Sequence, residues 1–332
     1  MIRIPTLTAA AAALAYAAAA LPASVHAQAH DHAQTHGAPT THAAAPAPMS
    51  ARDSAVLAEQ VAALRAATAR YRDHANAVRD GYRLFGQEGP VMGEHWFRRD
   101  LVDRPLDLSQ PSTLQYANID GRKVLVGVAY TVYRRPGDPV PEGFAGSGDG
   151  WHTHDVAQLA TAATADRPLA RRIVQRRIRE GKVGPEGRSL LTMVHAWVWL
   201  DNPDGLFAHE HRALPYLRAG LPAAWAADAP TGAPEGVALL APDACAAQVK
   251  RVERLARTDG EQERLLATAC EQQAAQLRAA VERQRDAAAV NTAAARAWAG
   301  YQAAAARLLY PGQRARMQRI LAAATEHAMV GM

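Results

Sequence analysis

Regularly spaced apolar residues predict a long helix near the start of the chain. Between Ser54 and Asp80, every third or fourth position belongs to one stripe, which is apolar except at Thr68. The stripe consists of Leu57, Val61, Leu64, Thr68, Tyr71, Ala75 and Val78. Gly81 follows, and glycine commonly ends helices because it tolerates a left-handed backbone. We therefore expect one helix within residues 50–80.

The middle of the chain has the composition of β-strands. Valine and tyrosine are concentrated from Lys123 to Arg134, and a second strand pattern runs from Ser189 to Leu200. A shorter strand is predicted from Pro111 to Tyr116, and the turn residues Asn118–Gly121 would join it to the next strand in a hairpin. Met92–Trp96 follows two glycines and a proline, which predicts a loop or a short edge strand.

The last part of the chain is expected to be helical throughout. Asp243 can cap a first helix that Asp259–Gly260 ends, and a second helix starts at Glu261. A break in this second helix is expected at Asn291, and Pro311–Gly312 precedes a last helix.

These patterns predict an α+β fold. A small mixed or antiparallel sheet domain at 81–222 would be flanked by the long N-terminal helix at 50–80 and by a C-terminal helical hairpin or bundle at 243–330. The hydrophobic content of 49% is largely alanine and aromatic residues make up only 6%, which favours helices over an all-β fold.

Residues 1–29 have the pattern of a secretory signal peptide. Arg3 supplies the positive end, Leu7–Leu21 is apolar, and Ala27–Ala29 is an A-x-A cleavage site. A membrane anchor is the alternative, but the apolar run is short for a span. No later stretch is apolar enough to cross a bilayer, so we expect a periplasmic or secreted protein.

A low-complexity segment at 30–49, here called the His-rich tail, follows the cleavage site. Its histidines stand among alanine, proline and threonine, a composition that cannot build a packed core, so disorder is expected. The histidines are His30, His32, His36 and His42. They are consistent either with loose capture of transition metals or with a plain solvated linker.

The two cysteines, Cys245 and Cys270, predict one disulfide, because an exported chain enters an oxidising compartment. Two free or metal-bound thiols are the alternative. In a helical hairpin Cys245 would lie about 15 residues before the turn and Cys270 about 10 after it, a mismatch of roughly 6–8 Å at the helical rise. The bridge therefore requires an asymmetric loop.

The charges do not indicate a nucleic-acid partner. The net charge is +5, and arginines are interleaved with acids except along a basic helix predicted from Asp166 to Gly181. The oligomeric state is left open.

Trp151–Asp155 contains the strongest candidate for a metal site. His152 and His154 would point the same way on an extended backbone, and the glycine-rich segment Gly146–Gly150 leads into them from a loop. Trp151 would form an apolar wall, and Asp155 could ligate a metal or orient an imidazole.

Six histidines fall within the segment that is expected to contain the sheet. They are His95, His152, His154, His195, His209 and His211, and Glu94, Asp155 and Glu210 are possible additional ligands or bases. Neutral imidazoles suit zinc, copper, nickel or iron(II), whereas Ca²⁺ and Mg²⁺ prefer oxygen ligands. Taken singly, His195 is typical of a core histidine and His209 and His211 of exposed loop residues. A metal site that uses at least three of the six is the favoured interpretation.

Five ordered motifs in the central region resemble a group of uncharacterised secreted bacterial proteins. The motifs are Met92–Trp96, Leu125–Tyr130, Pro141–Phe144 with Trp151–His154, Met193–Trp197 and Asn202–Phe207. The resemblance spans about Gly81 to Pro222 and implies that His95, His152, His154 and His195 form one set. The group has asparagine at the position of His211, and it implies no activity.

The C-terminal helices faintly resemble periplasmic metal-stress proteins of the Spy type. Their Leu-Thr-x-x-Gln signature corresponds to Leu309–Gln313, which lacks the threonine and is followed by Arg314, Arg316 and Arg319. A plain alanine-rich helical bundle explains this segment equally well.

The sequence is consistent with three alternative functions. The first is an exported, periplasmic transition-metal-binding protein that handles copper or zinc through the histidine cluster. The second is a periplasmic metalloenzyme, a hydrolase or an oxygen-using enzyme, with Glu94, Asp155 or Glu210 as base. The third is a helical interaction or chaperone-like protein whose histidines are structural.

Overall fold

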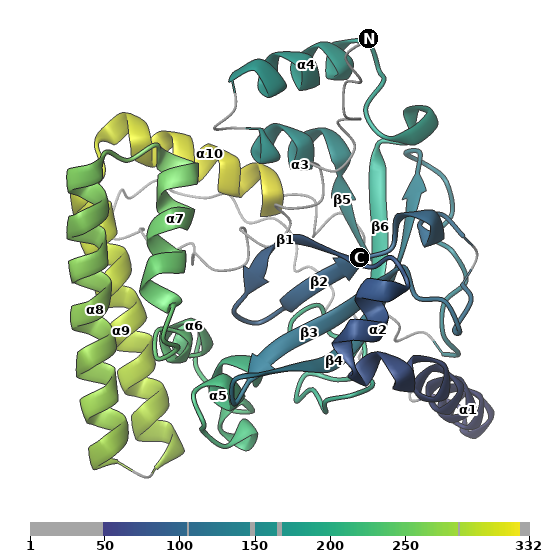
Figure 1. Ribbon diagram of the computed structural model, residues 1–332, viewed down its shortest axis with the longest axis horizontal. Coiled ribbons are helices and arrows are strands. Elements are labelled where there is room, and N and C mark those ends of the chain that lie inside the picture. The colour runs from purple at the N-terminus through teal and green to yellow at the C-terminus, as the bar shows by residue number, and fades with distance from the viewer. Residues whose placement is uncertain (1–48, 105, 147–149, 165–167, 285, 326–332) are drawn as a thin grey trace, which may run out of the picture.

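The computed structural model has a six-stranded sheet beside a set of helices from the last third of the chain (Figure 1). It describes residues 49–104, 106–146, 150–164, 168–284 and 286–325. The expected signal peptide, residues 30–48 of the His-rich tail, and residues 326–332 lie outside this part.

All neighbouring strands of the sheet are antiparallel, in the order β1-β2-β3-β4-β6-β5. Their bounds are β1 Arg83–Gly89, β2 Gly93–Phe97, β3 Thr113–Ile119, β4 Arg122–Arg134, β5 His152–Asp155 and β6 Leu190–Ala196. The predicted α+β class and the hairpin at Asn118–Gly121 are confirmed. The prediction for Met92–Trp96 is wrong in one respect, because β2 is an inner strand between β1 and β3.

The sheet has one apolar face, which α1 and α2 help to cover. This face carries Leu114 and Tyr116 of β3, Val128 and Tyr130 of β4, and Val194 and Ala196 of β6, all at alternate positions. Leu64 of α1 packs into the same core and is completely buried. Successive residues of a strand alternate between faces, so the opposite face carries other side chains. We call it the polar face, because Gln115 and His195 lie on it, although Met193 and Leu191 do so too.

The N-terminal helix is divided, which corrects the single helix expected from the apolar stripe. α1 spans Ala51–Thr68, a 3₁₀ turn covers Ala69–Arg72, and α2 spans His74–Arg79. Asp73 lies between the last two in an extended conformation, and its carboxylate caps α2 by accepting the N–H of Ala75. The break shifts the phase of the stripe, so Ala77 is buried and Val78 is 40% exposed.

The segment after β6 also departs from the predicted strand. The strand ends at Ala196, and the backbone N–H of Val198 turns back to the carbonyl of Ala196 at 2.9 Å. As a result Trp199 donates to the hydroxyl of Thr68 at 3.0 Å, far from the polar face, whereas Trp197 stays beside His195. The strand predicted from Ser189 to Leu200 is therefore wrong beyond Ala196.

The remaining helices fall into two groups. α3 and α4 follow β5 directly, and α5 and α6 lie between the sheet and the C-terminal helices (Figure 1). Their bounds are α3 Val156–Ala163, α4 Pro168–Arg179, α5 Leu214–Arg218, α6 Ala233–Ala238, α7 Ala244–Ala256, α8 Gly260–Arg283, α9 Ala287–Leu308 and α10 Pro311–Thr325. Short 3₁₀ turns occur at Arg99–Leu101, Pro185–Gly187 and Ala223–Ala226.

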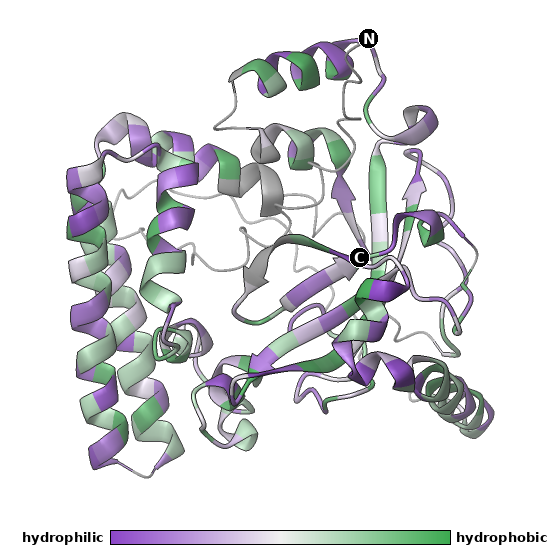
Figure 2. Ribbon diagram, viewed as in Figure 1, coloured by the Kyte–Doolittle hydropathy of each residue, from purple (hydrophilic) through white to green (hydrophobic). Residues whose placement is uncertain are grey.

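The C-terminal helices pack through small residues and alternating faces. Figure 2 shows hydrophobic and hydrophilic residues interleaved along α8 and α9, as expected for helices with one buried stripe. Gly236 of α6 approaches α9 so closely that a Cβ there would lie 2.0 Å from the carbonyl oxygen of Ala294. Any larger residue at 236 would separate the two helices.

The break expected at Asn291 occurs earlier, between the end of α8 at Arg283 and Asp286, which caps α9. Asn291 is instead a buried residue inside α9. Its carbonyl oxygen accepts from the hydroxyl of Tyr216 at 2.7 Å, and its amide donates to the carbonyl of Trp225 at 2.8 Å. These bonds join α9 to the α5 region, and the polar side chain therefore marks a tertiary contact.

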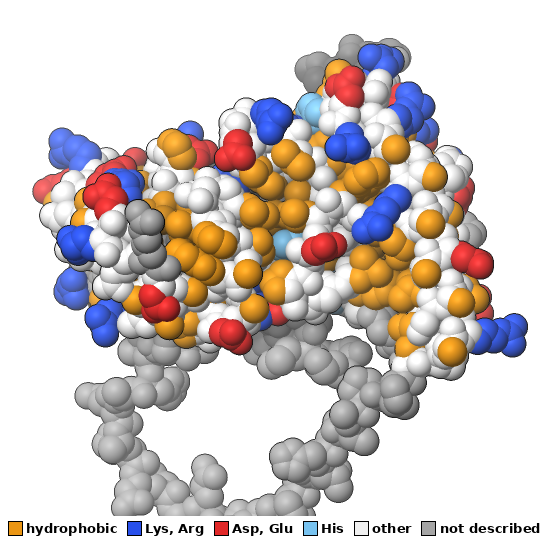
Figure 3. Space-filling model, turned by 90° about the horizontal axis from the view of Figure 1, so that it is seen from below, with side chains coloured by type: hydrophobic (Ala, Val, Ile, Leu, Met, Phe, Trp, Pro, Cys, Tyr) orange, Lys and Arg blue, Asp and Glu red, His pale blue; other side chains and the backbone are white. Residues whose placement is uncertain are grey.

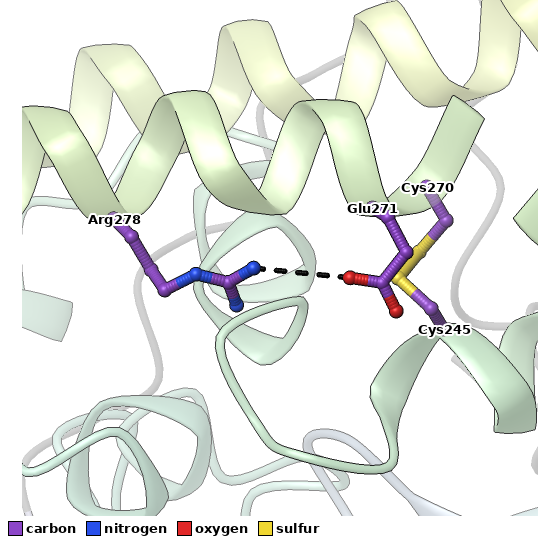
Figure 4. Close-up of a disulfide and its surroundings, with 4 residues drawn as sticks. All are labelled: Cys245, Cys270, Glu271 and Arg278. Carbon is purple, nitrogen blue, oxygen red and sulfur yellow. Dashed lines mark ion pairs between the residues drawn. A yellow bond between two sulfur atoms is a disulfide. The ribbon is translucent and has the colours of Figure 1, made fainter. Parts of the chain in front are cut away.

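The predicted disulfide is confirmed, joining Cys245 of α7 to Cys270 of α8 with Cα atoms 5.6 Å apart (Figure 4). Three residues, Arg257 to Asp259, lie outside both helices, and Arg257 ends α7 in a left-handed conformation. Counted from the helix ends, the two cysteines lie at nearly equal depth. This loop removes the mismatch that an ideal hairpin would have.

Removal of the disulfide is expected to destabilise the C-terminal helices. Replacing both cysteines by alanine frees a loop of 25 residues in the unfolded chain, for which loop-closure entropy predicts a loss of about 3–4 kcal/mol. Urea denaturation of the double variant, followed by circular dichroism, checks this value. An unchanged unfolding midpoint would show that the bridge contributes nothing.

No described helix has the length and apolarity needed to cross a membrane. The disulfide is compatible with a secreted protein. Figure 3 shows the face of the molecule that lies at the bottom of Figure 1. Positive and negative side chains are interspersed among apolar ones there, and neither kind of charge forms a continuous block.

Candidate metal centre

The strand register places four histidines and one glutamine on the polar face of the sheet. His95 of β2 pairs with Gln115 of β3, and Gln115 pairs with Gly127 of β4. Two positions further along β4, Ala129 pairs with His195 of β6. Directly paired residues of antiparallel strands point to the same side of the sheet, so these side chains share one face.

The edge strand β5 adds the His-x-His pair to this face. His152 pairs with Met193 and His154 with Leu191, which are alternate positions on the same side of β6 as His195. The expectation that His152 and His154 point the same way is therefore confirmed. Asp155 pairs with Leu190 and points to the other face.

A fifth histidine, His209, comes from the loop between β6 and α5. Two hydrogen bonds from Trp197 hold the part of the loop that precedes His209. The backbone N–H of Trp197 donates to the carbonyl of Leu206 at 2.9 Å, and its indole N–H donates to the carbonyl of Ala208 at 2.7 Å. After it, the backbone N–H of His211 donates to the carbonyl of Val91 at 2.7 Å. The position of His209 is thus fixed on both sides.

His152, His154 and His209 form a triad that could hold a metal ion. One ring nitrogen from each of them lies within 4.8 Å of the other two. Three such atoms always have a point within about 2.8 Å of all of them, compared with zinc–nitrogen bonds of about 2.0–2.1 Å. Small rotations of the side chains would therefore bring all three nitrogens to bonding distance.

The ring nitrogens around the triad fit the requirements of a metal. The Nε2 atoms of His152, His154 and His195 are shielded from solvent and have no hydrogen-bond partner among the described residues. Nδ1 of His152 lies 3.4 Å from the carbonyl oxygen of Gly150, to which it can donate, and this leaves the Nε2 lone pair available. Unpartnered buried nitrogens are costly in a purely structural cluster, whereas a metal ion would satisfy those of His152 and His154.

The protein environment keeps these imidazoles neutral. Burial lowers the pKa of His154 to about 4 and that of His209 to about 4. Burial lowers the pKa of His95 to about 3, and burial together with neighbouring histidines lowers the pKa of His152 and of His195 well below the usual value. Because metals bind the neutral ring, the site remains competent in mildly acidic solution.

His195 and His95 lie beside the triad. The ring centre of His195 is 5.0 Å from that of His152 and 5.7 Å from that of His209, and His95 is 5.6 Å from His195 on the far side. The structure thus gathers all four histidines of the sequence-based set, two of them within the triad. That His95 and His195 are themselves ligands stays a prediction.

The other candidates lie apart from the triad. Glu94 points to the opposite face of the sheet, where it accepts from the indole of Trp96 at 2.7 Å and forms an ion pair with Lys123. Asp155 accepts the backbone N–H of Gln158 at 2.9 Å at the start of α3. Neither carboxylate belongs to the metal-compatible group found among the described residues.

His211 and Glu210 flank the site without joining the triad. His211 is buried against Trp197, with ring centres 5.0 Å apart. Burial raises the pKa of Glu210 to about 7, so its carboxyl group is partly protonated near neutral pH. His74 packs edge-on against Trp96 on the apolar face, with ring centres 4.1 Å apart.

Gln115 is the site residue that the sequence analysis did not single out. It is fully buried on the polar face, between His95 and His195. A polar residue at an inward position of a strand was the available signal, because buried polar side chains need partners. Its room comes from Gly127, where a Cβ would lie 3.0 Å from the side-chain oxygen of Gln115.

Comparisons with protein-family models, with curated proteins and with solved structures find no match for this chain.

Proposed function

We propose that this chain is an exported transition-metal-binding protein that holds one copper or zinc ion on His152, His154 and His209. The observation that carries the proposal is the gathering of three ring nitrogens within 4.8 Å of one another. Their buried surroundings and lowered pKa values support a metal role, since a solvent-exposed histidine cluster would be protonated more easily.

The ligand chemistry favours copper or zinc over calcium or magnesium. Imidazole nitrogen suits the later transition metals, whereas Ca²⁺ and Mg²⁺ take mainly oxygen ligands, and the triad contains no carboxylate. Export is supported by the signal-peptide pattern at 1–29 and by the disulfide, which persists in an oxidising compartment. In this proposal the His-rich tail collects metal loosely and the folded triad retains it.

A metalloenzyme built on the same triad is the second candidate. Catalytic zinc sites commonly use three protein ligands and leave one position for water or substrate, and three is the number of imidazoles gathered here. Glu210 directly follows His209 in the sequence, and burial raises its pKa to about 7, in the range of a general base. Turnover in the presence of an exchangeable bound water would distinguish the enzyme from a binding protein.

Purification from the periplasm without an affinity tag tests the proposed function. We expect elemental analysis to find about one equivalent of copper or zinc per chain, and the same amount after deletion of residues 30–49. A folded protein without transition metal would contradict the proposal and favour a structural role for the histidines.

A further inference from the structure

The amide of Gln115 lies between two histidine rings of the polar face. Its Nε2 atom is 3.2 Å from Nε2 of His95 and 3.3 Å from Nδ1 of His195. All three side chains are buried, so the contacts are not shared with bulk water. An amide nitrogen carries two hydrogens and can donate one to each ring.

This arrangement determines where each ring carries its proton. A neutral imidazole has one N–H, and a nitrogen that accepts from Gln115 cannot carry it. His95 must then be protonated at Nδ1, and a backbone hydrogen bond at Gly93 raises its pKa, the sign expected for a ring N–H that donates to a carbonyl. His195 must be protonated at Nε2.

The protonated nitrogen of His195 lies next to the triad. Nε2 of His195 is buried and has no partner in the described part of the chain, and its ring packs edge-on against His152 at 5.0 Å. An N–H cannot bind a metal ion, but it can donate to another ligand of that ion. His195 is also outside the group of three whose nitrogens gather within 4.8 Å.

We propose that His195 is a hydrogen-bond donor rather than a metal ligand, and that it faces an open fourth coordination position on the His152–His154–His209 triad. That position takes a small anion or water, which accepts the N–H of His195. Gln115 is the positioning residue that holds His195 in this tautomer. This inference rests on the proposed metal site. It removes His95 and His195 from the ligands expected from the sequence.

Cobalt(II) and azide provide a direct test, because cobalt reports its coordination by visible absorption and azide occupies an open position. We expect the wild-type protein to bind one Co²⁺ and then azide. His195→Phe should keep the Co²⁺ affinity within about threefold and weaken azide binding by about tenfold or more, the effect of losing a hydrogen bond to a charged group. His195→Gln, which can place an amide N–H near the same point, should restore azide binding to within about threefold.

Gln115→Glu provides an independent arm that also covers a folding failure of His195→Phe. A carboxylate accepts the N–H at Nδ1 of His195, which leaves the Nε2 lone pair free to bind the metal. We expect Co²⁺ to bind at least as tightly as in the wild type while azide binding is lost. Azide binding equal to that of the wild type would overturn the role of Gln115.

The outcomes separate this inference from the proposed function. A loss of Co²⁺ in His195→Phe as large as that in His154→Ala would make His195 a ligand and overturn the inference, while the metal site would stand. A wild-type protein that binds no Co²⁺ outside its His-rich tail would contradict the proposed function itself.

Discussion

Replacing His154 by alanine is expected to abolish stoichiometric binding of Zn²⁺ or Cu²⁺ by the folded domain. His154 supplies one of the three nitrogens of the triad. Loss of a residue that only supports a ligand can already lower metal affinity about a hundredfold, so loss of a ligand should lower it at least as much. Competition with a chromophoric chelator measures this change. Circular dichroism of the variant confirms that β5 and the rest of the sheet are still folded.

Two matched controls accompany His154→Ala. His211→Asn changes the other histidine of His209-Glu210-His211, which lies against Trp197, and we expect it to retain one equivalent of metal. Deletion of residues 30–49 should also leave the tight site intact. If the deletion removed the bound metal and His154→Ala did not, the His-rich tail would be the binder and the triad would have no role.

The metal-free protein is expected to lose stability steeply between pH 6.5 and about 4. Above pH 6.5 the imidazoles are neutral in both the folded and the unfolded chain, so they cause no pH dependence. Below it the unfolded chain binds protons that His154 and His209, with pKa values of about 4, do not bind while folded. Each such histidine lowers the free energy of unfolding by about 1.4 kcal/mol per pH unit.

Urea denaturation of the metal-free protein at several pH values between 4.5 and 7.5 measures this slope. His154→Gln removes one of the titrating groups and should reduce the slope by about one proton, whereas Arg172→Gln, an exposed change on α4, should leave it unchanged. Bound Zn²⁺ should preserve stability to lower pH than an unperturbed histidine site would allow. An identical slope in His154→Gln and the wild type would contradict the burial of a neutral ring.

The sequence was sufficient to predict those parts of the fold that depend on local patterns. The hairpin turn at Asn118–Gly121, the strand that became β4 and the helices after Asp243 all follow from residue type and spacing. The divided N-terminal helix was missed because its stripe continues across the break, and only the cap at Asp73 reveals the change of phase. A polar residue within a helical pattern can mark a helix break or a buried tertiary contact, and the sequence does not distinguish the two. Asn291 makes a tertiary contact, with the hydroxyl of Tyr216.

The candidate site was predictable only in part, for a related reason. His152 and His154 are two residues apart on a strand, so alternation alone aligns them. His209 lies in a loop whose position depends on bonds from Trp197, and no periodicity encodes such contacts. The pairing of β4 with β6 brings His195 to the same face, and register between distant strands is not visible in a single sequence.

Anomalous X-ray scattering from a crystal of the zinc-loaded protein tests directly whether the triad holds the metal. We expect one strong peak at the zinc edge, about 2.0–2.1 Å from a ring nitrogen of each of His152, His154 and His209. A fully loaded crystal whose zinc peaks all lie away from these three rings would contradict it.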